Sequence, residues 1–234
     1  MNVLIIGAHP DDIEINCAGT AKKMIGRGDK VVMCNLCSGG LGHAVIQPEK
    51  LIRIRLEESR QSAAVIGAEH VCMGCGDMEL YHQDKTARDK VADIIRSAHP
   101  DLIITHSPGD YMSDHVSVSK LVFDASFCAS LPHYKTGIDT VVPVCPLYYM
   151  DNLGAFNFQP DEYVDITEEI ETKLAMLKCH RSQLAWMLDH DKIDFTETVK
   201  TFSRMRGLQA GVRYAEGFVP LKGWGRMTTK RLLP

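Results

Sequence analysis

Short apolar runs alternate with longer segments of helical periodicity over the first half of this chain, which limits the folds it can adopt. Four apolar runs have the length and composition of buried strands, at Val3–Ile6, Lys30–Leu36, His70–Met73 and Asp101–His106. Helical patterns follow them over 11–27, 48–66, 86–98 and 115–129. Strands that alternate with helices predict an α/β fold, a Rossmann-like three-layer sandwich with a mostly parallel, doubly wound sheet.

The alternation of predicted strands and helices is less regular in about the last hundred residues. Extended segments are predicted at 147–150 and 163–166, and helices at 167–188 and 197–208. Thr167, followed by two glutamates, is typical of a helix N-terminus. Because no linker, repeat or low-complexity segment divides the chain, residues 1–234 are predicted to form one domain with a C-terminal α/β elaboration.

The composition excludes some classes of function. A net charge of -4 and a pI of about 6.2 provide no basic field that would attract nucleic acid. The apolar run at the N-terminus is about half as long as the core of a signal peptide and has no basic flank. We therefore expect a soluble cytoplasmic protein with no membrane partner.

Eight cysteines include two CxxC pairs, Cys34/Cys37 and Cys72/Cys75. The pairs have the spacing of a four-thiolate zinc site or of a redox centre. Both pairs also begin inside apolar runs, where a free cysteine packs as a small hydrophobe. Reduced, mostly buried thiols are the favoured interpretation.

The first strand is followed at once by a group of ionisable residues. One imidazole and three carboxylates lie in the seven residues after Gly7, at His9, Asp11, Asp12 and Glu14. A tight loop stiffened by Pro10 can direct His9 and Asp12 toward one point, where their nitrogen and oxygen ligands suit a divalent cation such as zinc. The alternative is an acidic helix N-terminus, with Asp11 or Asp12 as the cap and Glu14 facing the helix dipole.

A second motif, Asp110–His115, follows the fourth predicted strand after a Ser-Pro-Gly turn. In an open α/β sheet, functional loops meet at the carboxyl ends of the strands near the point where the strand order reverses. If the first and fourth strands are neighbours, His9, Asp12 and His115 form a site with two histidines, one carboxylate and an open position for water.

With both motifs in view, the chain resembles the PIG-L/LmbE family of zinc-dependent N-deacetylases. Residues 8–14 match the family's AHPDDxE signature, and residues 110–115 are similar to its DxHxDH element. Weaker similarities occur at Arg55–Glu58, at Asp77 and at Tyr214–Phe218, which is similar to the closing motif of bacillithiol-pathway deacetylases.

The resemblance implies roles for individual residues. His9, Asp12 and His115 would hold Zn²⁺, or another divalent metal such as Fe²⁺, and Asp11 would activate the zinc-bound water as the general base. Arg55 would bind substrate. Glu14, Asp110 and Asp114 are the candidates for carboxylates that orient the ligand imidazoles or their loop, with a helix-cap or turn role as the alternative for each.

One position departs from the family pattern. The family usually has a histidine in the middle of DxHxDH as a partner for the oxyanion, and this chain has Met112 there. A thioether cannot donate a hydrogen bond. Either His43, His106 or Tyr111 supplies the contact to the substrate, or the metal is the sole electrophile.

The leading hypothesis is therefore a metal-dependent amide hydrolase that removes the acetyl group from an N-acetylated amino sugar or its glycoside. The alternatives are an amidase on a thiol-sugar conjugate and a non-catalytic sugar-binding homologue. The expected partner is a small-molecule substrate, and the family suggests a homo-oligomer. Trp186 and Trp224 could line a sugar pocket or pack internally, and other histidines such as His180 are predicted to be surface or core residues.

Overall fold

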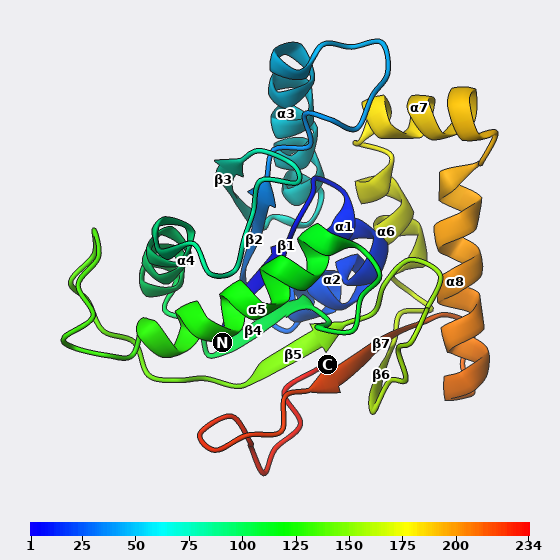
Figure 1. Ribbon diagram of the computed structural model, residues 1–234. Coiled ribbons are helices and arrows are strands. Elements are labelled where there is room, and N and C mark those ends of the chain that lie inside the picture. The colour runs from blue at the N-terminus through cyan, green and yellow to red at the C-terminus, as the bar shows by residue number, and fades with distance from the viewer.

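A computed structural model describes residues 1–234 as a seven-stranded sheet with helices on both faces (Figure 1). The strands are β1 (Asn2–Gly7), β2 (Lys30–Cys37), β3 (Glu69–Cys75), β4 (Leu102–His106), β5 (Leu147–Met150), β6 (Glu162–Asp165) and β7 (Ala215–Pro220). The helices are α1 (Asp12–Asn16), α2 (Ala18–Gly26), α3 (Pro48–Ile66), α4 (Lys85–Ala98), α5 (Ser113–Cys128), α6 (Ile170–Leu177), α7 (Arg181–Asp191) and α8 (Phe195–Ala210).

The strand order is β3-β2-β1-β4-β5-β7-β6, and the first five strands are parallel. The order reverses at β1, which pairs with β2 on one side and with β4 on the other. The predicted doubly wound α/β fold is confirmed. The loops after β1 and β4 are therefore neighbours, as a shared site requires.

Two separate apolar cores make this a three-layer structure. Alternate residues of β1 face opposite sides, so that Val3 and Ile5 join a core with α1, α2 and α6, whereas Leu4 and Ile6 join a core with α4 and α5. All four side chains are almost completely buried. Near-continuous apolar strands of this kind are typical of a parallel sheet covered on both faces.

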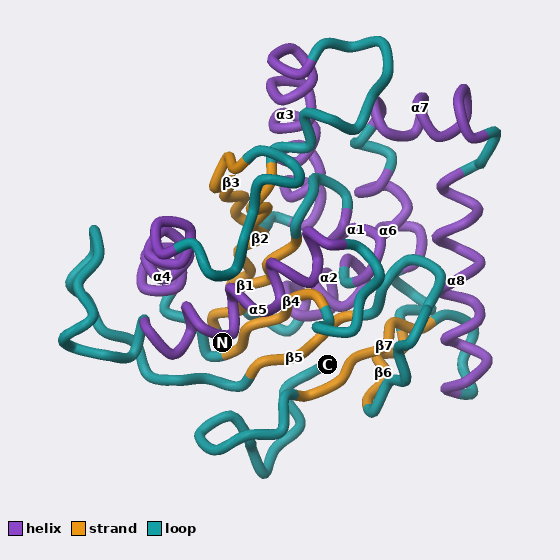
Figure 2. The backbone as a smooth tube through the Cα atoms, viewed as in Figure 1, coloured by secondary structure: helices purple, strands orange, loops and turns teal.

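The C-terminal elaboration extends the same sheet. The last strand, β7, pairs antiparallel with β5 and then with β6, so it lies between two strands that precede it in sequence. This strand was missed in the sequence, because Ala215–Pro220 contains a charged residue, a glycine and a proline. Helix α8 packs against β7, and longer loops join β2 to α3 and α5 to β5 (Figure 2).

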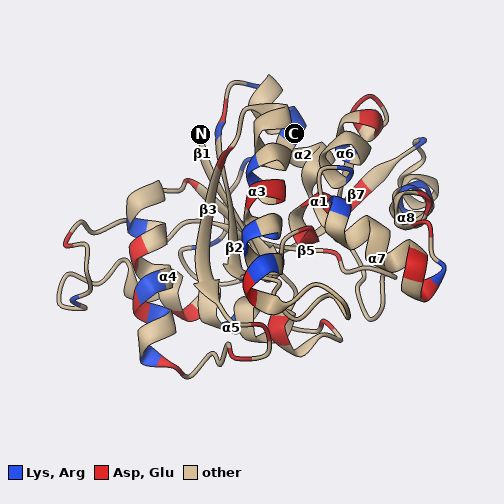
Figure 3. Cartoon of the chain, turned by 90° about the horizontal axis from the view of Figure 1, so that it is seen from above, with Lys and Arg blue, Asp and Glu red and all other residues tan.

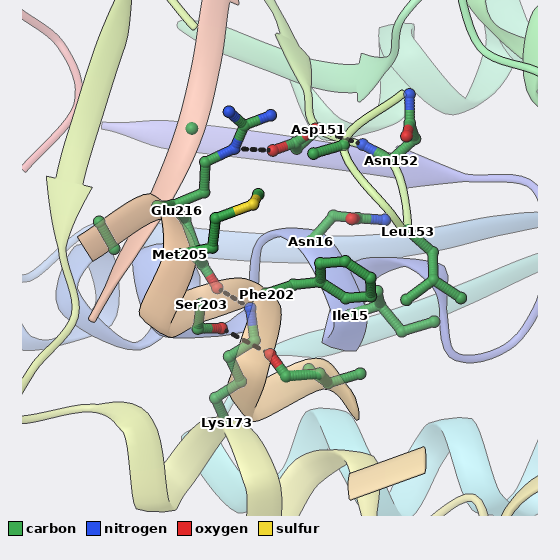
Figure 4. Close-up of a pocket in the computed structure, with 15 residues that line it drawn as sticks. Ile15, Asn16, Asp151, Asn152, Leu153, Lys173, Phe202, Ser203, Met205 and Glu216 are labelled. Atoms are coloured by element: carbon green, nitrogen blue, oxygen red, sulfur yellow. Dashed lines mark hydrogen bonds and ion pairs between the residues drawn. The ribbon is translucent and has the colours of Figure 1, made fainter. Parts of the chain in front are cut away.

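The helix predicted over 11–27 is two helices that break at Cys17, whose φ is −143°. The cause is distant in sequence. The Glu216 carboxylate on β7 accepts hydrogen bonds from the backbone N–H groups of Gly19 and Thr20, at 3.0 and 2.8 Å, and so caps α2. Lys173 forms a buried ion pair with Glu216 at 2.6 Å, beside the small pocket shown in Figure 4.

The helix predicted over 167–188 is also divided, into α6 and α7, and its predicted cap is wrong. The Thr167 hydroxyl donates to Asp165 at 2.6 Å, and the helix begins only at Ile170. Between the two helices, His180 is completely buried, with its Nε2 3.0 Å from Glu14 Oε1.

All eight cysteines are free thiols, and the two CxxC pairs do not form a group of metal ligands. Cys34 and Cys37 are fully buried on β2, next to the partly buried Cys72 and Cys75 of β3. Acidic and basic residues are interspersed along α3 and α4 (Figure 3). None of the helices combines the length and apolar character that crossing a membrane requires.

Candidate metal centre and active site

The structure brings together the three residues that the two motifs nominate as metal ligands. The ligand atoms of His9, Asp12 and His115 all lie within 4.8 Å of one another, and the two rings have centroids 5.6 Å apart. His9 Nδ1 is 3.7 Å from one oxygen of Asp12, and His115 Nε2 is 3.2 Å from the other. Two loops separated by about a hundred residues thus point their side chains at one place.

Each of the two imidazoles has a carboxylate behind it. His9 Nε2 is 2.9 Å from Asp114, and His115 Nδ1 is 3.0 Å from Asp110. A neutral imidazole that donates one N–H to a carboxylate carries its lone pair on the other nitrogen. Both lone pairs then face Asp12, which is an arrangement that a cation stabilises.

The carboxylates around this centre favour a positive charge there, either a proton on His115 or a metal cation. Burial by itself lowers the pKa of His115, but Asp12 and Asp110 raise it to about 10. Burial would raise the pKa of Asp12, and the imidazoles of His115 and His106 hold it well below its usual range. His115 Nε2 is buried and has no hydrogen-bond partner. Two nitrogens and a carboxylate fit the donor set of a zinc site.

Asp11 lies beside this centre in a strained conformation. Its φ is 108°, which is rare for a residue with a side chain, and such strain concentrates at functional sites. The Arg55 guanidinium lies 3.4 Å from the Asp11 carboxylate and donates to the Pro10 carbonyl at 2.6 Å. Burial raises the pKa of Asp11 to about 6, although Arg55 opposes the shift. A buried carboxylate of this basicity can accept a proton from water near neutral pH.

A cavity of about 450 Å³ opens above these groups. His9, Asp11, Asp12, Arg55, Asp114 and His115 line it, together with side chains of four loops and of the C-terminal helices. Asp77 also lines it and accepts the backbone N–H groups of Gly39 and Leu41, at 2.7 and 2.8 Å. The glycine-rich loop after β2 is thereby fixed against the site.

The substrate contacts predicted from the sequence divide into two groups. Arg55 and Tyr111 line the cavity, as does Met112 at the position of the family's histidine. His106 is completely buried beneath Asp12 and stacks on His115, with ring centroids 3.8 Å apart. It cannot reach a substrate, and that prediction is corrected.

The prediction that His43 contacts the substrate is also wrong. Its Nδ1 accepts the backbone N–H groups of Val45 and Ile46, and its ring packs on Trp186, outside the cavity wall. Of the three donors considered in place of the missing histidine, Tyr111 alone lies on the cavity.

Glu14, predicted to support the ligands, contacts neither ligand imidazole. It accepts a hydrogen bond from Ser62 of α3 and lies beside His180. Its contribution is to hold the segment after β1 against neighbouring helices.

The C-terminal helices contribute cavity residues that sequence reasoning missed. Gln183, Met187 and Phe195 line the wall, and the Oε1 of Gln183 is buried with no hydrogen-bond partner. No local motif marks these residues, since only the packing of α7 and α8 brings them to the site. Neither tryptophan lines this cavity; Trp186 stacks on His190, and Trp224 is fully exposed.

Comparison with known proteins accounts for this arrangement. Residues 4–126 match the model of the PIG-L family, described as GlcNAc-PI de-N-acetylase. Diacetylchitobiose deacetylase of Thermococcus kodakarensis is 30% identical over 93% of this chain and 83% of its own. The 4-oxalmesaconate hydratase of Pseudomonas putida is 25% identical over 78% of this chain and 74% of its own.

A solved structure agrees in fold. The N,N'-diacetylchitobiose deacetylase of Pyrococcus horikoshii superposes with a TM-score of 0.82 at 26% identity, covering 94% of this chain and 83% of that one. The family match includes β1, β4 and both histidine-bearing loops. The chain therefore belongs to the PIG-L family of N-deacetylases.

Proposed function

We propose that this protein is a metal-dependent N-deacetylase that hydrolyses the acetamide of an N-acetylated amino sugar or of its glycoside. The observation that carries the proposal is the convergence of two carboxylate-backed imidazoles and Asp12 on one point, beside a strained, buried Asp11. The relative with 30% identity is a deacetylase of diacetylchitobiose, an N-acetylated sugar.

His9, Asp12 and His115 would hold the metal, for which we propose zinc, with Fe²⁺ as the alternative. When bound, such a cation acts as a Lewis acid toward a carbonyl and toward water. Asp110 and Asp114 fix the tautomers of the ligand imidazoles, so that their free lone pairs face the centre.

Asp11 would accept the proton of the attacking water and deliver it to the departing amine nitrogen. Arg55 holds the Asp11 carboxylate and the Pro10 carbonyl, so it fixes the direction of this base. The Tyr111 hydroxyl would supply a hydrogen bond to substrate that Met112 cannot give.

The charged residues that line the cavity favour binding of a neutral amide over binding of a carboxylate substrate like that of the hydratase relative. A hydratase of 4-oxalmesaconate acts on a carboxylate, and recognition of carboxylates depends on Arg and Lys. Arg55 is the one Arg or Lys that lines this cavity, and the wall carries four carboxylates, at Asp11, Asp12, Asp77 and Asp114. Even with a divalent cation bound, the wall keeps a net negative charge, which repels a polyanionic substrate.

The test is release of free amine from N-acetylglucosamine, N,N'-diacetylchitobiose and their glycosides by protein of measured metal content. Asp11→Asn is expected to lower kcat by about 10²- to 10⁴-fold with no loss of bound metal. Asp12→Asn is expected to lose the metal, and Asp139→Asn, at an exposed position, should behave as wild type.

Metal-loaded protein that releases amine from no amide would overturn the proposal in favour of a sugar-binding protein. Release from other sugar amides but not from acetamides would favour the amidase alternative. Hydration of an unsaturated carboxylate, lost in Asp12→Asn, would favour the hydratase chemistry.

A further inference from the structure

The mouth of the active-site cavity is apolar, in contrast to its floor. Leu41, Met78, Tyr111 and Met112 all line the cavity, and their side chains remain 63%, 61%, 53% and 39% exposed. They come from three loops that follow β2, β3 and β4. Large apolar side chains that gather at one opening, rather than singly over the surface, mark a binding site.

One of these side chains, Met78, is held in place by residues around the metal centre. Met78 has a φ of +63°, a strained conformation for a methionine. Its backbone N–H donates to Asp114 at 3.0 Å, and the Ser113 hydroxyl contacts its sulfur at 3.5 Å. The strained turn is therefore maintained by the same carboxylate that supports His9, and it keeps an apolar side chain at the rim.

Tyr111 is braced in a similar way. Its ring packs edge-on against Phe156 of the loop between β5 and β6, with centroids 5.7 Å apart. Phe156 is itself 61% exposed, so a fourth loop continues the apolar surface outward from the cavity. The rest of the cavity is lined by the charged and imidazole side chains of the centre and by four further apolar residues, Ile15, Leu153, Met187 and Phe195.

A free amino sugar would gain little from this rim, because its edges are hydroxyl groups and the rim side chains offer few donors or acceptors. An alkyl or aryl group attached to the sugar would bury apolar surface there, with a gain of about fourfold in binding for each methylene fully buried. The favourable burial would hold the amide at the floor while the attached group occupies the rim.

We propose that the substrate of this enzyme carries an apolar alkyl or aryl group that binds at the rim formed by Leu41, Met78, Tyr111 and Met112. This inference rests on the proposed function and narrows its substrate class. The apolar group has two possible origins, the aglycone of a glycoside or an acyl chain longer than acetyl, and the same rim chemistry would recognise either.

Two series of substrates separate these origins. The first consists of methyl, propyl and hexyl β-glycosides of N-acetylglucosamine, and the second of N-acetyl-, N-propanoyl- and N-hexanoylglucosamine. In the series that matches the substrate, kcat/KM is expected to rise about two- to fourfold per added methylene until the rim is filled. A rise in either series supports the proposal and identifies the origin of the apolar group.

Substitutions at the rim test whether its side chains cause the dependence of kcat/KM on the length of the apolar group. The double substitution Leu41→Ser, Met112→Ser is expected to abolish most of the dependence of kcat/KM on the length of the apolar group. Leu208→Ser is the matched control, since Leu208 is 66% exposed on α8 and lies outside the cavity. It should retain the full dependence.

Equal kcat/KM along both series, with amine released throughout, would overturn the inference while the proposed function stands. Absence of amine from every substrate would instead reject the proposed function. Calorimetry with the Asp11→Asn variant then tests the rim without turnover, and equal affinity for the methyl and hexyl glycosides would reject it. A change in oligomeric mass in the double variant, with chain-length dependence intact, would show that the rim covers another copy of the chain.

Discussion

At the scale of single residues, the geometry of the centre depends on two carboxylates that lie behind the imidazoles of His9 and His115. Asp110 lies 3.0 Å from Nδ1 of His115, and Asp114 lies 2.9 Å from Nε2 of His9; both histidines are proposed metal ligands. Without them, either tautomer of His9 and His115 would be available, and each imidazole could present an N–H instead of a lone pair to a bound cation.

Asp110→Asn should therefore lower metal affinity by about 10- to 100-fold, because the amide stabilises the imidazole tautomer less well than the carboxylate. Competition with a chromophoric chelator measures the change. Asp139→Asn, at an exposed carboxylate, is the control. Unchanged affinity in Asp110→Asn would mean that Asp110 only caps the turn through the backbone N–H of Met112.

The residues at the centre could be predicted because the motifs lie directly after strands, and parallel strands deliver such residues to one edge. His106 could not be interpreted in the same way. It is the last residue of β4, where the alternation of side chains turns it under Asp12 instead of into the cavity. In the sequence, a histidine in the loop after a strand cannot be distinguished from a histidine at the end of the strand itself. In the structure, the two side chains face different surroundings.

At the scale of elements, α2 and the C-terminal elaboration fit closely. A methyl group added at Gly19 would lie 2.6 Å from the side chain of Ile166, the residue that follows β6. This contact explains why the first turn of α2 contains glycine despite the low helix propensity of that residue.

Gly19→Ala should lower the free energy of unfolding by about 1–3 kcal/mol through overpacking, and this loss should be smaller in an Ile166→Ala background, which lacks the Cγ2 atom of the close contact. Urea denaturation measures both. Gly26→Ala, in the same helix with nothing within 4 Å, should be neutral or stabilising by up to about 1 kcal/mol. Equal effects at the two glycines would contradict the packing explanation.

The breaks in the two divided helices could not be predicted from the sequence. The segments 11–27 and 167–188 have continuous helical periodicity, yet each breaks where a buried charged group from another element intervenes. Glu216 caps α2 from β7, and His180 lies against Glu14 of α1. These contacts span 197 and 166 residues, so no local pattern contains them.

At the scale of the whole molecule, the pair of His180 and Glu14 joins the N-terminal half of the sheet to the C-terminal helices. Burial alone would lower the pKa of His180, but the Glu14 carboxylate raises it above 6.5. The folded protein therefore binds this proton more tightly than the unfolded chain, and the resulting stabilisation is complete below about pH 6.5.

Raising the pH from 6.5 through the elevated pKa of His180 should lower the free energy of unfolding. His180→Asn should be less stable than wild type at pH 6 and should lose stability less steeply over this range. His133→Asn, at an exposed histidine, is the control. Parallel stability profiles for wild type and His180→Asn would contradict the assignment; melting temperatures at fixed metal concentration provide the measurement.

The position of β7 between β5 and β6 also has a consequence for synthesis on the ribosome. β5 leaves the ribosome well before β7. The edge of β5 that faces away from β4 therefore has no partner until β7 has left the exit tunnel. Throughout this interval the nascent chain presents an open strand edge, of the kind that recruits other chains. Translational pauses over residues 166–214 would lengthen that exposure, so yield during expression should depend on codon usage there more than in the segment that encodes the metal ligands.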